Sequence, residues 1–167
     1  MMSNFFEYME QLPVQDEYYI YDEQRQEPVK VVLDKQNLDY KYIVVDNALH
    51  QTLEFTPVDN KIEIKKEDGN TDSVCDALVT SDKRLSFIEI KDWRQGWKSK
   101  AKEQCGNTLK HFSAAHPEDK RRKQAYLCNV ALNFDIKRPL AASEKEEKEL
   151  FFSEYRARLI VGNVVFP

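Results

Sequence analysis

Three side chains in the middle of the chain have the types and spacing that phosphate chemistry needs. Asp76 lies in one apolar run, and Glu89 and Lys91 lie in a second apolar run after a gap of a dozen residues. If the runs pair as strands, Glu89 and Lys91 share a face, and Asp76 can join them there. Unpaired buried charge costs several kcal/mol, so such a cluster needs neutralising partners or a bound cation.

The chemistry that this trio suits is hydrolysis of a phosphodiester. Asp76 and Glu89 would supply hard oxygen ligands for Mg²⁺ or Mn²⁺ and leave positions open for water and phosphate oxygens. Lys91 would stabilise the deprotonated attacking water and the charge that develops on the phosphate. The alternative is that Asp76 ends its strand in a turn, while Glu89 and Lys91 form an ordinary charge pair on a solvated sheet face.

The elements that would position the trio follow from the pattern of apolar residues. Strands are predicted over residues 61–66, 74–80 and 86–92, with a hydrophilic turn at 80–84. A helix of about sixteen residues to Phe112 follows, and then an apolar strand over 124–134, predicted to be central in the sheet. The order is therefore strand, strand, strand, helix, strand.

Asp76 followed at this distance by Ile88-Glu89-Ile90-Lys91 resembles the signature of the PD-(D/E)xK, or restriction-endonuclease-like, nuclease superfamily. The resemblance covers about the middle third of the chain. Cys75 stands where the family name has proline. It implies an α/β (α+β) fold with a restriction-endonuclease-like core, a mixed central sheet flanked by helices, here with extra amino-terminal strands. The Glu-x-Lys tripeptide alone is unspecific, because it recurs at Glu63-Ile64-Lys65.

The resemblance also implies further site residues. The main-chain carbonyl of Ile90 would be another metal ligand, and Gln104 on the following helix would reach back toward the acids. An extra metal-facing acid would come from Glu54 or Asp46, on a helix predicted from Asp46-Asn47 through Phe55. The alternatives are a glutamine with no role at the border of the buried face of the helix and an acidic stripe that faces water.

Charge is unevenly distributed along the chain. The formal net charge is −4, yet residues 91–123 hold ten Lys/Arg against four Asp/Glu. A basic segment next to the acidic trio predicts contacts to a polyanion. The expected nucleic-acid contacts are Arg94, Lys98, Lys102, Lys120, Arg121, Arg122 and Lys123. A solvated helix face and an ordinary surface loop are the alternatives.

Length and composition indicate a single domain over residues 1–167, with a nuclease-like core at about 40–135 and additions at 1–39 and 136–167. The additions are predicted to contain a helix over 5–12, strands over 17–22 and 28–34, a helix over 143–155 and a closing hairpin or edge strand over 157–166. No apolar run is long enough to span a bilayer, and no secretory leader is recognisable, so we expect a cytoplasmic protein without a membrane partner. Three widely spaced cysteines predict reduced core residues and not a zinc site.

Two function classes remain. One is a Mg²⁺- or Mn²⁺-dependent nuclease that acts on nucleic acid, with DNA expected, as a monomer, a homodimer or with a partner protein. The other is a non-catalytic adaptor or regulatory binding protein on the same fold, in which the acidic trio is structural. The intact trio favours the first class, and the acidic net charge favours the second.

Overall fold

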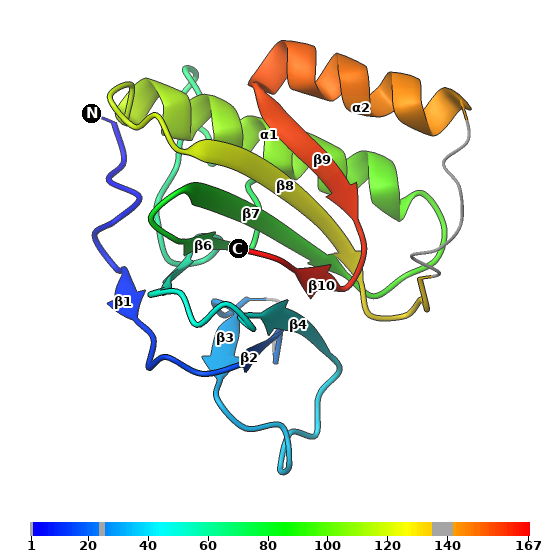
Figure 1. Cartoon of the computed structure of the whole chain (residues 1–167). Helices are drawn as coiled ribbons and strands as arrows, with labels where there is room; N and C mark the ends of the chain where they lie inside the picture. Colours follow the sequence, from blue (N-terminus) through cyan, green and yellow to red (C-terminus); the bar gives the residue numbers. More distant parts are fainter. Residues whose placement is uncertain (1, 24–25, 135–141) are drawn as a thin grey trace.

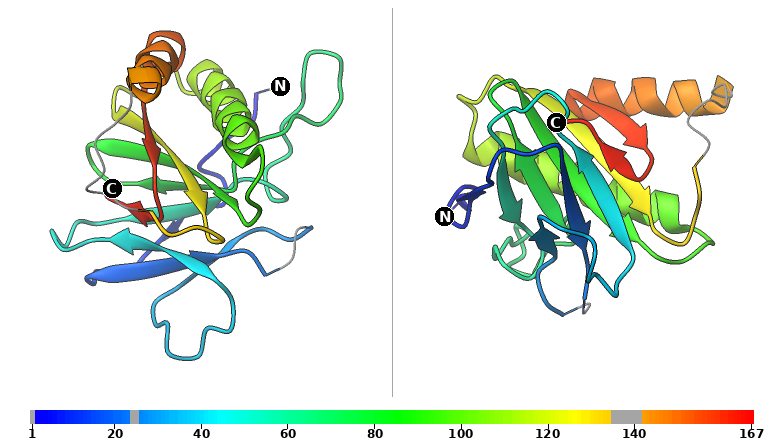
Figure 2. Two further views of the ribbon diagram at one scale, coloured as in Figure 1. Left: turned by 90° about the vertical axis from the view of Figure 1, so that its right-hand side faces the viewer. Right: turned by 60° about the horizontal axis from the view of Figure 1, so that its bottom comes forward.

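The computed structural model describes residues 2–23, 26–134 and 142–167, and these segments form a mixed α+β fold of three layers (Figure 1). A larger sheet lies in the middle, with two helices on one face and a smaller sheet on the other (Figure 2). In spatial order, the larger sheet contains β1 (Glu10–Gln11), β5 (Glu54–Pro57), β6 (Ala77–Thr80), β7 (Arg84–Lys91), β8 (Arg122–Asn129) and β9 (Ala157–Val161). The smaller sheet contains β10 (Val164–Val165), β4 (Tyr42–Asp46), β2 (Glu17–Tyr21) and β3 (Lys30–Val32). The helices are α1 (Trp97–Ala115) and α2 (Ala142–Tyr155).

The middle of the larger sheet follows the predicted order. β6 and β7 form an antiparallel hairpin, α1 crosses over the sheet, and β8 returns parallel to β7. Parallel neighbours need such a crossover, and a helix is the usual connection. Gly96, in the left-handed region at φ 67°, turns the chain into α1. β8 lies between β7 and β9, so the predicted strand is interior, although it is second from the edge of the sheet and ends at Asn129 and not at 134.

Two hydrophobic cores lie on the two faces of the larger sheet. Leu85 and Phe87 of β7 pack toward the helices, whereas Ile88 packs toward the smaller sheet. Because strand side chains alternate between faces, Glu89 and Lys91 continue the helix-facing series. The two cores therefore determine the side of the sheet on which the candidate site forms. The predicted mixed central sheet is confirmed, but both helices cover the same face, and the amino-terminal strands cover the other.

The helix predicted over residues 5–12 is wrong. The chain makes a turn at 5–8 and then β1. Phe5 and Leu12, seven residues apart, would lie on one side of a helix, but Phe5 packs in the core under the helices and Leu12 in the core between the sheets. An extended path around the sheet edge is what allows one short segment to fill both cores.

The helix predicted from Asp46 to Phe55 is also wrong. β4 ends at Asp46 and β5 begins at Glu54. Asp46 and Asn47 use their side chains in local turns, in which Asp46 Oδ1 accepts from the Ala48 amide and Asn47 Oδ1 accepts from the Gln51 amide. His50 at φ 51° breaks any helical continuation.

Two further predictions need correction. Residues 61–66 form no strand: Ile62 and Ile64 are buried as their alternation predicts, but the pairing is a single bridge between Lys65 and Thr71. β5 takes the place of the expected first strand, so the order of elements is kept. The carboxy-terminal segment forms edge strands, one of the two predicted alternatives, and not a hairpin: β9 pairs with β8 at the edge of the larger sheet and β10 with β4 at the edge of the smaller one. Neither helix has the length and apolar character that crossing a membrane requires, over the part of the chain described.

Candidate functional site

The hairpin of β6 and β7 brings the predicted trio together at one end of the larger sheet. Ala77 pairs with Ile88, and the Asp76 amide donates to the Ile88 carbonyl at 3.0 Å. The end of the hairpin places Asp76 near Glu89, close enough for the Asp76 charge to raise the Glu89 pKa. Asp76, Glu89 and Lys91 all line one pocket of about 540 Å³. The alternative of a solvated sheet face is not what the structure shows, since Glu89 is only 2% exposed.

Glu89 and Lys91 form a buried ion pair with a distance of 2.6 Å between Lys91 Nζ and Glu89 Oε1. Gln104 completes the arrangement: its Oε1 accepts from Lys91 Nζ, and its Nε2 donates to the Val74 carbonyl at 3.0 Å. The side chain of Gln104 therefore links the segment that precedes β6 to Lys91. The prediction that a residue of α1 reaches back to the site is confirmed as a contact.

The environment of both carboxyl groups disfavours their charged forms. Asp76 Oδ2 accepts from the Ile90 amide at 2.7 Å, yet burial raises the Asp76 pKa from 3.8 to about 7. Burial, and then the nearby Asp76 charge, raise the Glu89 pKa well above its ordinary value. Glu89 Oε2 is buried and has no hydrogen-bond partner among the described residues. A buried oxygen that lacks a partner is costly, and a cation would satisfy it.

The pocket is strongly acidic and receives side chains that sequence reasoning missed. Its charged lining has seven carboxylates and two amines: Asp22, Glu23, Glu27, Asp59, Asp76, Glu89 and Asp92, with Lys41 and Lys91. Asp22, Glu23 and Glu27 come from the end of β2 and the segment toward β3, so the smaller sheet forms one wall. Nothing near Asp22 in the sequence signals this, because the placement depends on the packing of one sheet on the other.

Asp59 is the second acid that sequence reasoning missed. Its amide donates to the Cys75 carbonyl at 3.2 Å, which extends the pairing of β5 with β6 and holds Asp59 beside Asp76. Burial raises its pKa as well. Asp59 lies in a turn that follows β5, and because that strand was itself not predicted, the sequence carried no usable signal for this position.

The donor set for a metal consists of two carboxylates, with the Ile90 carbonyl as a possible third oxygen, since Ile90 also lines the pocket. Within the described ranges, no three His, Cys, Asp or Glu side chains converge closely enough to hold a metal ion. Mg²⁺ commonly keeps several waters and takes one or two protein carboxylates together with substrate oxygens. The residues present fit that mode of binding and not a fully protein-enclosed metal site.

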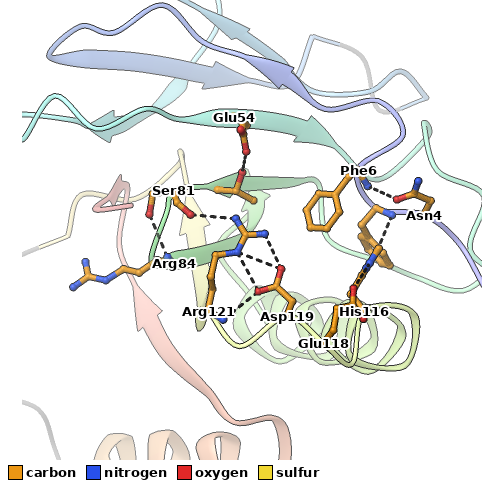
Figure 3. A network of polar contacts seen from close by, with 11 residues as sticks. Asn4, Phe6, Glu54, Ser81, Arg84, His116, Glu118, Asp119 and Arg121 are labelled. Atoms are coloured by element: carbon orange, nitrogen blue, oxygen red, sulfur yellow. Dashed lines mark hydrogen bonds and ion pairs between the residues drawn. The ribbon is translucent and has the colours of Figure 1, made fainter.

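Glu54 and Asp46, the expected extra acids, do not join the pocket. Glu54 lies on β5 opposite Thr80, at the far end of β6 from Asp76, and its Oε2 accepts from Thr80 Oγ1 at 2.8 Å (Figure 3). Asp46 is held in its own turn. Both predictions depended on a helix that does not form.

The basic residues of α1 are also not where the charge pattern placed them. Lys98 and Lys102 both pair with Glu147 of α2, at 3.5 and 3.2 Å, and so belong to the contact between the helices. Arg94 is exposed in the segment between β7 and α1, close in sequence to the pocket residues Asp92 and Trp93. Of these three cations, Arg94 alone remains a candidate contact at the site.

Lys120, Arg121, Arg122 and Lys123 lie at the start of β8, whereas the acidic pocket lies at the end of β7. Because β7 and β8 are parallel, with Arg84 beside Arg122 and Lys91 beside Asn129, the two groups lie at opposite ends of these strands. The prediction that the basic run lies next to the site was based on proximity in sequence. It is wrong because the crossover through α1 returns the chain to the far end of the strands.

Comparison with known proteins adds no assignment: no protein family, curated protein or solved structure matches the chain.

Proposed function

We propose that the acidic pocket hydrolyses phosphodiester bonds of nucleic acid, with DNA as the expected substrate, by a PD-(D/E)xK-like mechanism. The observation that carries the proposal is the buried Glu89 Oε2 without a partner, in a pocket that Asp76 and Lys91 also line. A restriction-endonuclease-like core is part of the proposal. It is supported by the order β5, β6, β7, α1, β8, with the acids on the β6–β7 hairpin and Gln104 on α1.

Asp76, Glu89 and the Ile90 carbonyl would hold Mg²⁺ or Mn²⁺, which when bound supplies a Lewis acid that neutralises charge on the scissile phosphate. Burial raises the pKa values of both carboxyl groups, and a bound cation would oppose this by favouring the charged carboxylates. Lys91 does not provide enough compensation, because it contacts Glu89 through Oε1 and leaves Oε2 unsatisfied.

Lys91 would act on the water that attacks the phosphate. Its ammonium group lies in the pocket wall and is oriented by Glu89 on one side and Gln104 on the other. A fixed positive charge at this point favours the deprotonated water and the charge of the transition state. Lysine suits this role because it is a compact charge on a flexible stem. The acidic remainder of the pocket would admit a phosphate only with the cation present.

The test is conversion of supercoiled plasmid to nicked or degraded DNA with Mg²⁺ or Mn²⁺, compared with EDTA. Glu89→Gln keeps the size of the side chain and removes the charge, and should abolish the activity while the protein still unfolds cooperatively. Glu54→Gln is the matched control, since Glu54 lies at the other end of β6. Equal activity in wild type and Glu89→Gln would refute the proposed site.

Besides the acidic net charge, one structural observation favours the adaptor function: within the described residues, no third side chain completes a metal-binding group. In that case the Glu89–Lys91–Gln104 arrangement would be a structural network. A protein that shows no hydrolysis and no divalent-cation affinity, but keeps its stability in Mg²⁺-free buffer, would favour this second candidate.

A further inference from the structure

A second pocket, of about 690 Å³, lies where the amino-terminal ends of β7, β8 and β9 meet the carboxy-terminal end of α1. Most of its charged lining is positive. We call it the basic pocket, defined by Arg84, Lys120, Arg122, Lys123, Arg156 and Arg158. Its character is the opposite of the acidic pocket, although the two lie at the two ends of the same strands.

The sheet register lines up the arginines. Arg84 of β7 pairs directly with Arg122 of β8, and Arg158 of β9 pairs with Gln124, two residues beyond Arg122. Residues paired across strands share a face, and so do residues two apart, so all three arginines lie on one face. Neighbouring strands are about 4.8 Å apart, and like charges at that spacing destabilise a sheet.

Nothing in the pocket neutralises these charges. Its one acidic lining residue is Asp119, which is occupied by Arg121 at 2.7 Å. Figure 3 shows Arg121 directed at Asp119 and at the Ser81 carbonyl, which accepts from its Nη1 at 3.1 Å, while Arg84 points away from this network. Within the described part of the chain, Arg84, Arg122 and Arg158 form no ion pair. Arg121 is therefore a structural residue, and the remaining arginines have guanidinium groups available to a ligand.

A planar guanidinium matches the oxygens of a phosphate, and a row of them suits a ligand with repeated phosphates. The three strands extend the row over two inter-strand spacings, about 10 Å, which is wider than a single phosphate needs. Gln124 Nε2 donates to the Phe166 carbonyl and to Ser86 Oγ, so its donor group is already used within the protein. These features favour a nucleic-acid backbone recognised without regard to sequence.

We propose that the basic pocket binds the phosphate backbone of nucleic acid at a site separate from the acidic pocket. From Arg84 to Lys91, β7 spans seven steps, or about 23 Å. One base pair spans about 3.4 Å, so a duplex that reaches both sites must extend over at least about seven base pairs. This length requirement depends on the proposed hydrolytic function, whereas binding at the basic pocket does not.

The binding test uses the full chain in EDTA with a fluorescein-labelled 20-base-pair duplex, measured by anisotropy across a series of salt concentrations. A variant with Arg84→Gln, Arg122→Gln and Arg158→Gln should bind at least tenfold more weakly, with a salt slope lower by about two to three. The control is Lys61→Gln, Lys65→Gln and Lys66→Gln, the same charge change on exposed residues elsewhere, expected to alter affinity less than twofold. Arg158→Gln alone changes an exposed side chain and should weaken DNA binding about threefold. This single variant replaces the triple variant in the test if the triple variant does not fold.

Unchanged affinity in the triple variant, or competition by polyglutamate as strong as by unlabelled DNA, would overturn the proposal. The hydrolytic arm compares duplexes of 6 and 30 base pairs with Mn²⁺. Wild type should show a lower KM for the longer duplex, and the triple variant should lose that difference. DNA binding without hydrolysis would refute the proposed function and leave the basic pocket supported. Hydrolysis with unaltered binding in the triple variant would refute the basic pocket alone.

Discussion

The two ends of β7 and β8 carry pockets of opposite charge that are built in different ways. The acidic pocket combines side chains from β6, β7, α1 and the smaller sheet, and its central carboxylate is almost fully buried. The basic pocket takes most of its charges from the starts of three parallel strands and the loop before β8, and Arg122, Arg156 and Arg158 are exposed. Buried charges interact strongly and shift each other's pKa values, whereas exposed charges act mainly through their number. Changes in the first pocket should therefore alter rate and stability, and changes in the second should alter affinity and salt dependence.

The largest effect is expected from Lys91→Ala. Loss of its charge should lower the single-turnover cleavage rate by about 10²- to 10⁴-fold, because Lys91 is the only amine among the described residues that contacts Glu89. Lys123→Ala, at the other end of the neighbouring strand, should weaken DNA binding and leave the rate at saturating DNA unchanged. Equal losses of rate in both variants would contradict the division between the two pockets.

The next effect concerns stability and pH. The Asp76 pKa is raised to about 7, so the folded protein retains a proton that the unfolded chain releases near pH 4. Without metal, the free energy of unfolding should therefore decrease as pH rises from about 4 to about 7 and then level off. Asp76→Asn removes this penalty and should be more stable than wild type at pH 8, by about 4 kcal/mol, and nearly equal at pH 4.

Urea unfolding at pH 4, 6 and 8 in EDTA measures this difference. Added Mn²⁺ should stabilise wild type and leave Asp76→Asn unchanged, since the ion binds the deprotonated carboxylate. A wild-type protein that is more stable than Asp76→Asn at pH 8 in EDTA would show that the carboxylate is already compensated.

A smaller effect is expected from Gln104→Met, which keeps the length of the side chain and removes the contact to Lys91. Because Gln104 positions Lys91 and does not contact the reacting atoms, kcat should decrease about tenfold with KM unchanged. Gln104→Glu retains an acceptor and should recover part of kcat. A purely structural role would instead give similar rates per folded molecule in all three proteins.

The smallest effect is expected from Arg121→Gln. Loss of the pair with Asp119 should lower the free energy of unfolding by about 1 kcal/mol. DNA affinity should change less than twofold, because this guanidinium is already occupied. If Arg121→Gln weakens DNA binding as much as Arg158→Gln does, then Arg121 contacts the ligand as part of the basic pocket.

What the sequence could predict follows the range of the interactions involved. The β6–β7 hairpin, α1 and β8 were predicted from local periodicity, and with them the convergence of Asp76, Glu89 and Lys91, whereas the reach of Gln104 to the site was implied by the family resemblance. Asp22 and Asp59 were missed because their positions depend on the packing of one sheet on another and on a strand that was itself not predicted. The position of Glu54 was wrong because a turn residue, His50, adopts a left-handed conformation that ends the apparent helix. The placement of the basic run was wrong because the crossover through α1 returns the chain to the start of β8, so that Arg122 lies at the opposite end of these strands from Lys91.

The most direct test of the central claim is calorimetric titration of Mn²⁺ into wild type, Glu89→Gln and Glu54→Gln at pH 8. The proposed site predicts saturable binding to wild type and Glu54→Gln, and at least tenfold weaker binding to Glu89→Gln. The same Mn²⁺ affinity in Glu89→Gln as in wild type, or no saturable binding to wild type, would contradict a cation site at the buried Glu89 carboxylate.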